Sequence, residues 1–184
     1  MQIYFMRHGQ TDANLRINNG ESPGNIDPPL NNLGINQAHI AANELKNVNF
    51  DAILTSPLKR ALQTAEIVNE FHKLPITITD QLTERHLDSY ALPDTWRELF
   101  DFDKNIRPEN GETVSEFFDH VYKFIDKLRQ DYKDKTILVV THGGVGHAFH
   151  AYMNNLPLEG NLQVLRMQNC EYRIYKLQEN LDSL

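Results

Sequence analysis

Residues 136–144 read TILVVTHGG, and this stretch decides the fold class. Its first six residues, 136–141, are almost continuously apolar, which is typical of a strand in a sheet that is covered on both faces. A helix is expected soon afterwards, from about Gly144 to Asn154. A buried strand that leads directly into a helix is the unit from which α/β domains are built.

The same alternation of strands and helices extends outward along the chain. Short apolar stretches predict further strands at 2–6, 52–55 and 76–79. Apolar residues at helical spacing predict helices at 33–46, 56–71 and 113–132. We therefore expect an α/β fold over residues 1–184: a single doubly wound domain of three layers, with a mostly parallel central sheet and helices on both faces.

Local signals define the ends of these elements and the segments between them. Ser56 followed by Pro57 predicts a helix N-cap with proline at the first helical position. Thr113 and Glu116 have the spacing of a capping box. Three further segments are expected to be a long loop at 9–32, an irregular stretch at 80–111 with a short helix near 96–102, and a closing β-hairpin formed by 162–168 and 171–177.

The composition is typical of one soluble domain. The 184 residues include 18 Lys and Arg against 25 Asp and Glu, so the net charge is −7. This balance argues against a broad surface for nucleic acid or an anionic membrane, but it allows a small anion site made from a few arginines. Cys170 is the single cysteine, so no intramolecular disulfide can form. With neither a signal-peptide pattern nor a long apolar run, the chain is expected to be cytoplasmic.

Three expected strands are followed by residues that can carry chemistry. Arg7, His8 and Gly9 follow the first strand, Arg60 comes soon after the strand at 52–55, and His142 follows the strand at 136–141. Ligands of open α/β sheets bind outside the carboxyl ends of the strands, so these side chains are expected at one rim. Glycine beside each histidine allows the backbone to approach a ligand closely.

Taken together, the motifs resemble those of the histidine phosphatase superfamily, also called phosphoglycerate-mutase-like. The matching pieces occur in the family's order and cover most of the chain: RHGQT at 7–11, Asn14, PLNNLGINQA at 29–38, SPLKRALQTA at 56–65, LTERH at 82–86, GET at 111–113 and VTHGG at 140–144. The resemblance implies a phosphomonoester hydrolase that acts on a small phosphorylated metabolite through a phosphohistidine intermediate.

The resemblance also implies a role for each residue at the rim. His8 would attack phosphorus, which requires a lone pair on one ring nitrogen and a backbone carbonyl that fixes the other. Arg7 and Arg60 would bind the phosphoryl oxygens together with His142, because guanidinium groups match phosphate oxygens. Glu84, from the LTERH piece, would be the general acid that protonates the leaving group and then activates water.

Further residues of these motifs would contact the substrate. The candidates beside the two arginines are Gln10, Thr11, Asn14 and Gly143. No metal ion or other cofactor is implied, because the arginines already supply positive charge. His147 and His150 lie one helical turn apart and are conceivable metal ligands together with His142, but the three do not form a recognised pattern of metal ligands.

The segment after Glu84 departs from the family's mutases, which carry extra basic residues there. Residues 87–110 contain three basic and six acidic residues, including Asp88, which gives a charge of −3. This favours a phosphatase over a cofactor-dependent phosphoglycerate mutase. A non-catalytic module that binds a phosphorylated ligand is the other alternative, and the presence of His8, Arg7, Arg60, His142 and Glu84 disfavours it. The segment 85–110 and the loop 12–32 would line the binding site for the part of the substrate other than its phosphate. The physiological substrate, the oligomeric state and the role of Asp88 stay open.

Overall fold

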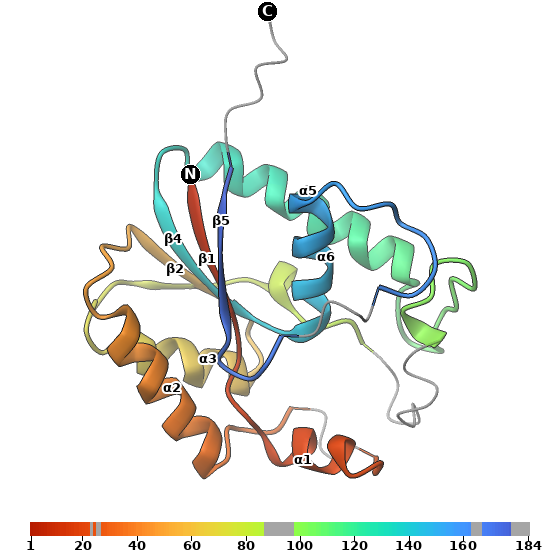
Figure 1. Ribbon diagram of the computed structural model, residues 1–184, viewed down its shortest axis with the longest axis horizontal. Helices are drawn as coiled ribbons and strands as arrows, with labels where there is room; N and C mark the ends of the chain where they lie inside the picture. The colour runs from red at the N-terminus through yellow and green to blue at the C-terminus, as the bar shows by residue number, and fades with distance from the viewer. Residues whose placement is uncertain (23, 25–26, 87–97, 163–166, 178–184) are drawn as a thin grey trace, which may run out of the picture.

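The computed structural model describes residues 1–22, 24, 27–86, 98–162 and 167–177. Within these residues, five strands form one sheet in the order β3-β2-β4-β1-β5 (Figure 1). The strands are β1 (Gln2–Arg7), β2 (Ala52–Thr55), β3 (Ile76–Ile78), β4 (Thr136–Thr141) and β5 (Tyr172–Lys176). β5 is antiparallel to β1, and the other neighbouring strands are parallel. The sheet is therefore mostly parallel, as predicted.

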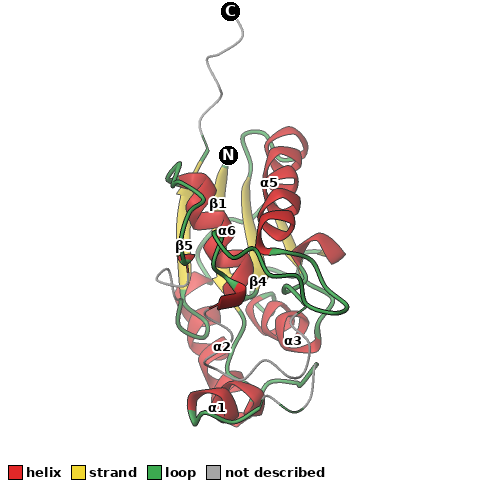
Figure 2. Ribbon diagram, turned by 90° about the vertical axis from the view of Figure 1, so that its right-hand side faces the viewer, coloured by secondary structure: helices red, strands yellow, loops and turns green. Residues whose placement is uncertain are grey.

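Helices cover both faces of this sheet (Figures 1 and 2). One core includes apolar residues of α2 (Asn32–Leu45) and α3 (Lys59–Val68), and the other includes those of α5 (Val114–Asp131) and α6 (Gly143–Met153). The central strands contribute alternate residues to each core: Ile137 and Val139 face α5 and α6, whereas Leu138 and Val140 belong to the opposite core. This alternation explains why the stretch 136–141 is apolar throughout. The three-layer α/β prediction is confirmed.

The predicted start of α5 is confirmed in detail. The hydroxyl of Thr113 accepts a hydrogen bond from the backbone N–H of Glu116 at 3.2 Å, and the Glu116 carboxylate accepts from the Thr113 N–H at 2.9 Å. Each side chain thus satisfies a backbone donor that the first helical turn leaves without a partner. Within the described residues, no helix is both long enough and apolar enough to span a membrane.

The prediction that residues 9–32 form one loop is wrong. They contain α1 (Asp12–Asn18), which lies beyond the carboxyl end of β1 (Figure 1). Thr11 caps this helix: its hydroxyl accepts from the N–H of Asn14 at 3.2 Å, and its own N–H donates to the Asn14 side chain at 3.1 Å. The capping pair stabilises a short helix in a stretch that lacks a helical apolar pattern.

The predicted start of α3 is also wrong. Leu58, rather than Ser56, is the N-cap residue, and the helix ends at Val68 rather than near 71. The Ser56 hydroxyl instead contacts His142 at 2.8 Å. The Asp27 carboxylate, from a distant segment, accepts a hydrogen bond from the Lys59 N–H at 2.8 Å. It thus provides an acceptor for a backbone N–H that has no partner within the helix.

The predicted hairpin at the carboxyl end is not formed by the described residues. β5 pairs with β1 at the edge of the sheet, and residues 162, 167 and 168 are not in a strand. Residues 163–166 of the expected first arm lie outside the described residues. Of the expected short helix near 96–102, residues 98 and 99 are helical, and 96 and 97 lie outside the described part.

Candidate active site

His8 follows β1 and is 3% exposed. Its Nδ1 lies 2.7 Å from the carbonyl oxygen of Gly9, and its Nε2 lies 3.2 Å from Nε of Arg60, which can only donate. The proton of the ring is therefore on Nδ1, and Nε2 keeps its lone pair. Burial lowers the pKa of His8 well below its usual value, and the charges of Arg60 and Arg7 act in the same direction. The ring is neutral near pH 7, with a potential nucleophile at Nε2.

Two arginines approach this histidine from different elements. Arg7 ends β1, and its Nη1 donates to the carbonyl of Met167 at 2.5 Å. Arg60 lies in the first turn of α3, and its Nη1 lies 3.8 Å from the Asp27 carboxylate. Burial lowers the pKa of Arg60, whereas the charges of Glu84 and Asp27 raise it. The guanidinium groups remain charged at neutral pH and form a local anion site in an acidic protein.

His142 lies at the start of α6, directly after β4, and is fully buried. Its ring centre is 5.2 Å from that of His8, and its Nε2 lies 2.8 Å from the Ser56 hydroxyl oxygen. Burial is the largest cause that lowers its pKa well below the usual value. Electrostatic interactions with Arg60, His8 and Arg7 lower it further. His142 is therefore also neutral, and the groups that affect its pKa are those of the predicted phosphoryl site.

Glu84 reaches the same region from the segment after β3. One carboxylate oxygen accepts from the Gly144 N–H at 3.0 Å, and the other accepts from the Arg85 N–H at 3.1 Å. A Cβ at Gly144 would overlap this carboxylate, so glycine is needed for the close approach. Burial raises the pKa of Glu84, although the Gly144 N–H and the charge of Arg60 oppose the rise. A raised pKa suits a carboxyl group that donates a proton near neutral pH.

Arg85 supports the segment beside Glu84, a role that the sequence reasoning did not assign. The side chain is 2% exposed and donates to the carbonyl oxygens of Leu99, Ile106 and Glu112. Its guanidinium carbon lies 5.6 Å from the centre of the Phe100 ring, and burial lowers its pKa to about 10. Arginine in the LTERH motif was the signal, because a single guanidinium can satisfy several carbonyl groups at once.

The other predicted substrate contacts have structural partners. Thr11 and Asn14 form the cap of α1, and the Gln10 side chain accepts from Asn31 at 3.2 Å. Gly143 lies beside Arg7, whose Nε would be 3.6 Å from a Cβ at that position. Their contact with a substrate stays a prediction. Asp88, the rival carboxylate, lies outside the described residues.

Thr64 and Asn169 also hold the site together, and sequence reasoning assigned neither. The Thr64 hydroxyl accepts from the Gly9 N–H at 3.0 Å and donates to the Arg60 carbonyl at 2.7 Å. The Asn169 amide donates to the His8 carbonyl at 3.0 Å. Thr64 belongs to the SPLKRALQTA motif, whereas Asn169 had no signal beyond its place in an expected turn.

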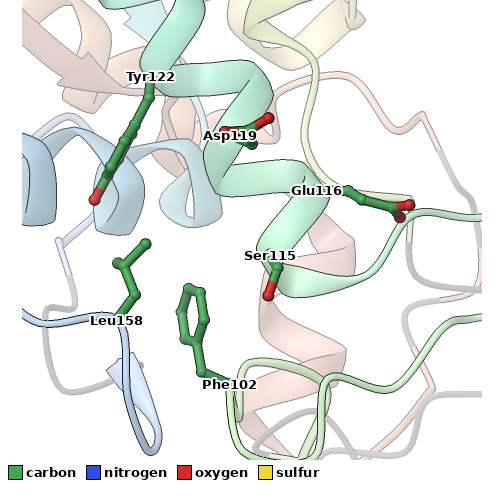
Figure 3. A pocket seen from close by; sticks show the side chains of 6 residues that line it. All are labelled: Phe102, Ser115, Glu116, Asp119, Tyr122 and Leu158. Carbon is green, nitrogen blue, oxygen red and sulfur yellow. The ribbon is translucent and has the colours of Figure 1, made fainter.

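A separate groove on α5 differs in chemistry (Figure 3). Its lining consists of Phe102, Ser115, Glu116, Asp119, Tyr122 and Leu158. Glu116 is engaged by Arg107 and by the Thr113 backbone in the cap of the helix. The two acidic side chains disfavour a phosphorylated ligand there, so the histidine and arginine cluster is the better phosphate site.

Comparison with known proteins identifies relatives over most of the chain. The family model of the histidine phosphatase superfamily (branch 1) matches residues 3–183. An uncharacterized phosphatase, PhoE, of Bacillus subtilis is 40% identical over 147 residues, which are 79% of this chain and 74% of PhoE. The adenosylcobalamin/alpha-ribazole phosphatase of Escherichia coli is 31% identical, over 92% of this chain and 87% of its own length.

A solved structure shows the same fold. A mycobacterial glucosyl-3-phosphoglycerate phosphatase in complex with VO3 matches with a TM-score of 0.79 and 26% identity. The match covers 94% of this chain and 91% of that protein. The sequence motifs, the sheet topology and the comparisons therefore all indicate the same protein family.

Proposed function

The chain belongs to the histidine phosphatase superfamily and is a phosphatase, and we propose that it hydrolyses small phosphomonoesters through a phosphohistidine at His8. The observation that carries this mechanism is the arrangement of the His8 ring. Because Nδ1 lies 2.7 Å from the Gly9 carbonyl, the proton is fixed there and Nε2 presents a lone pair. The reaction is split into two displacements at phosphorus, with Nε2 as nucleophile in the first and leaving group in the second, and each step is easier than a single displacement.

In the first displacement, the Nε2 lone pair of His8 forms a bond to phosphorus, and the bond from phosphorus to the alcohol oxygen breaks. The Glu84 carboxylic acid gives its proton to the departing oxygen. Arg60 transfers the hydrogen bond that it makes to Nε2 onto a phosphoryl oxygen, and Arg7 adds further positive charge. Such positioning and charge stabilisation supply most of the catalysis in phosphoryl transfer.

In the second displacement, the Glu84 carboxylate takes a proton from water, and the water oxygen attacks phosphorus. The bond between Nε2 and phosphorus breaks, its electron pair returns to the His8 ring, and inorganic phosphate leaves. Both steps use the same charged groups, so the scheme does not require a metal ion. Activity after treatment with EDTA would test that part of the proposal.

The acidic segment after Glu84 supports a phosphatase over a mutase. The charge of −3 over residues 87–110 gives little attraction for the carboxylate of a phosphoglycerate. The proposed substrate class is therefore a phosphomonoester of a small metabolite, with water rather than a second substrate as the final acceptor. Release of inorganic phosphate from a panel of phosphometabolites, compared with isomer formation from 3-phosphoglycerate, separates the two activities.

The test of the mechanism is His8→Ala, with His39→Ala as its matched control. His39 lies on α2, and its side chain is 48% exposed. We expect His8→Ala to abolish hydrolysis of para-nitrophenyl phosphate and of the best metabolite, because the attacking lone pair is removed. His39→Ala should retain wild-type rates. Full activity in His8→Ala would contradict the mechanism.

A further inference from the structure

Ser56 has two hydrogen-bond contacts that together define the state of its hydroxyl group. The residue is fully buried at the end of β2. Its Oγ accepts from the Leu58 N–H at 3.3 Å, and it lies 2.8 Å from Nε2 of His142. These contacts occur where the Ser56 N–H donates to the Val140 carbonyl at 3.2 Å, so the parallel strands β2 and β4 hold the two residues together.

The hydrogen bond between Ser56 and His142 determines which ring nitrogen of His142 carries the proton. A serine hydroxyl has one hydrogen to donate, and a buried hydroxyl normally uses it. Among the described residues, Nε2 of His142 is the acceptor recorded for Ser56. A neutral imidazole carries one N–H, so if Nε2 accepts, the proton of His142 is on Nδ1.

The Nδ1 atom of His142 is buried, and the described residues provide no hydrogen-bond partner for it. A buried N–H without an acceptor is costly, so such a donor favours a ligand that accepts a hydrogen bond. The neighbouring groups are His8, Arg60 and Arg7, which are the groups that bind and attack the phosphoryl group in our proposal.

We propose that Ser56 is a positioning residue that holds His142 as its Nδ1–H tautomer, so that this N–H donates to a phosphoryl oxygen. The inference rests on the proposed function, because it assumes that the ligand is a phosphoryl group. The other tautomer would present a lone pair to a negatively charged oxygen and would weaken binding in the ground state and the transition state. Ser56 does not touch the reacting atoms and acts through His142.

The direct test is the tautomer itself, measured by nitrogen NMR on protein labelled with ¹⁵N-histidine. We expect the Nδ1 of His142 to be protonated in the wild type, and the Nε2–H form to become populated in Ser56→Ala. The His142→Asn variant assigns the signals. A wild-type ring protonated on Nε2, or a Ser56→Ala ring that stays fully in the Nδ1–H form, would overturn the inference. This readout does not depend on activity.

Kinetics provide the second readout. In Ser56→Ala, the His142 N–H no longer donates reliably to the charged phosphoryl group. Loss of one such hydrogen bond corresponds to about a 10- to 100-fold fall in kcat/KM, and we expect a similar loss of vanadate affinity. Ser56→Thr keeps the hydroxyl and should restore both. Ser115→Ala is the control, because Ser115 lies on α5 at the separate groove (Figure 3). Wild-type kinetics in Ser56→Ala would overturn the role, whereas activity in His8→Ala would instead refute the proposed mechanism.

Folding is checked by thermal unfolding of each variant. Should Ser56→Ala fail to fold, Ser56→Cys replaces it, because a thiol is a weaker donor than a hydroxyl. The expected result is then a detectable Nε2–H population with reduced vanadate affinity. An unchanged Nδ1–H ring in Ser56→Cys, together with unchanged affinity, would count against the inference.

Discussion

At the nucleophile, burial and two guanidinium groups act in the same direction. Each lowers the pKa of His8, and the same three influences lower the pKa of His142. Arg7 and Arg60 thus have two consequences for the site: they attract a phosphoryl group, and they keep both imidazoles neutral. A protonated His8 could not attack phosphorus, so this electrostatic environment is a condition for the chemistry.

Glu84 is expected to matter most for substrates with a basic leaving group. Glu84→Gln should slow hydrolysis of an alkyl phosphate by roughly 10²-fold or more, because an alkoxide needs a proton to depart. Formation of the phosphoenzyme from para-nitrophenyl phosphate should be affected much less, because nitrophenolate leaves without one. Pre-steady-state bursts with the two substrates separate this step from the later attack of water.

The Asp88→Asn variant is the control for this assignment. If Glu84→Gln slowed both substrates equally, and Asp88→Asn selectively slowed the alkyl substrate, the role of general acid would belong to Asp88. The raised pKa of Glu84 also predicts that the alkyl reaction persists to higher pH than the usual pKa of a glutamate would allow.

Sequence motifs predicted which residues meet at the site, but not how they are held. The structure brings together His8, Arg7, Arg60, His142 and Glu84, all of which were expected. Their supports were not expected, because Ser56, Thr64 and Asn169 act through hydrogen bonds to residues far away in the chain. Such contacts depend on the packed sheet and leave no local pattern in the sequence.

Among the elements, the buried strands and long helices were predicted well because their apolar periodicity is strong. The short helix α1 was missed because one capping pair, and no apolar stripe, supports it. The start of α3 was misplaced because the Ser56 hydroxyl contacts His142, the residue that follows β4, instead of capping the helix. The Asp27 carboxylate accepts from the Lys59 N–H in the first turn of the helix instead. Tertiary contacts therefore override a local capping signal at the position where the site needs the serine.

The capping box of α5 leads to a prediction about stability. Thr113→Ala removes the hydroxyl that accepts from the Glu116 N–H, so we expect the free energy of unfolding to fall by about 1 kcal/mol. Urea unfolding measures the change. Ser115→Ala, in the same helical turn, is the comparison, and equal losses in the two variants would contradict a specific role of the cap.

Across the whole molecule, the net charge of −7 coexists with a local cluster of positive charge. The acidic net charge disfavours large polyanions, whereas Arg7 at the end of β1 and Arg60 in the first turn of α3 favour a small one. The composition had allowed this combination, since a few arginines suffice for one phosphoryl group.

The buried histidines also predict how stability depends on pH. His8 and His142 have pKa values below that of an unfolded histidine, about 6.5, so the unfolded state binds more protons as the pH falls. Their contribution is fully present above about pH 6.5 and is lost as the pH falls towards their folded pKa values. Urea unfolding between about pH 7.5 and 5 should therefore show decreasing stability.

Variants isolate this contribution from other titrating groups. His8→Ala and His142→Ala should each have a shallower dependence on pH, by up to about 1.4 kcal/mol per pH unit. The raised pKa of Glu84 acts in the opposite sense and is present in all of these proteins. A wild-type slope that persists in both variants would show that the two rings are not the groups responsible.

The central claim is a covalent phosphoryl group on His8, and trapping it is the most direct test. Glu84→Gln protein, in which the attack of water is slow, is mixed with para-nitrophenyl phosphate and quenched in alkaline denaturant for peptide mass spectrometry. We predict one phosphoryl group on His8 that is stable to alkali and labile to acid, and none in the double variant with His8→Ala. An acid-stable phosphoryl group on a serine or threonine, or continued turnover without modification of His8, would contradict the account.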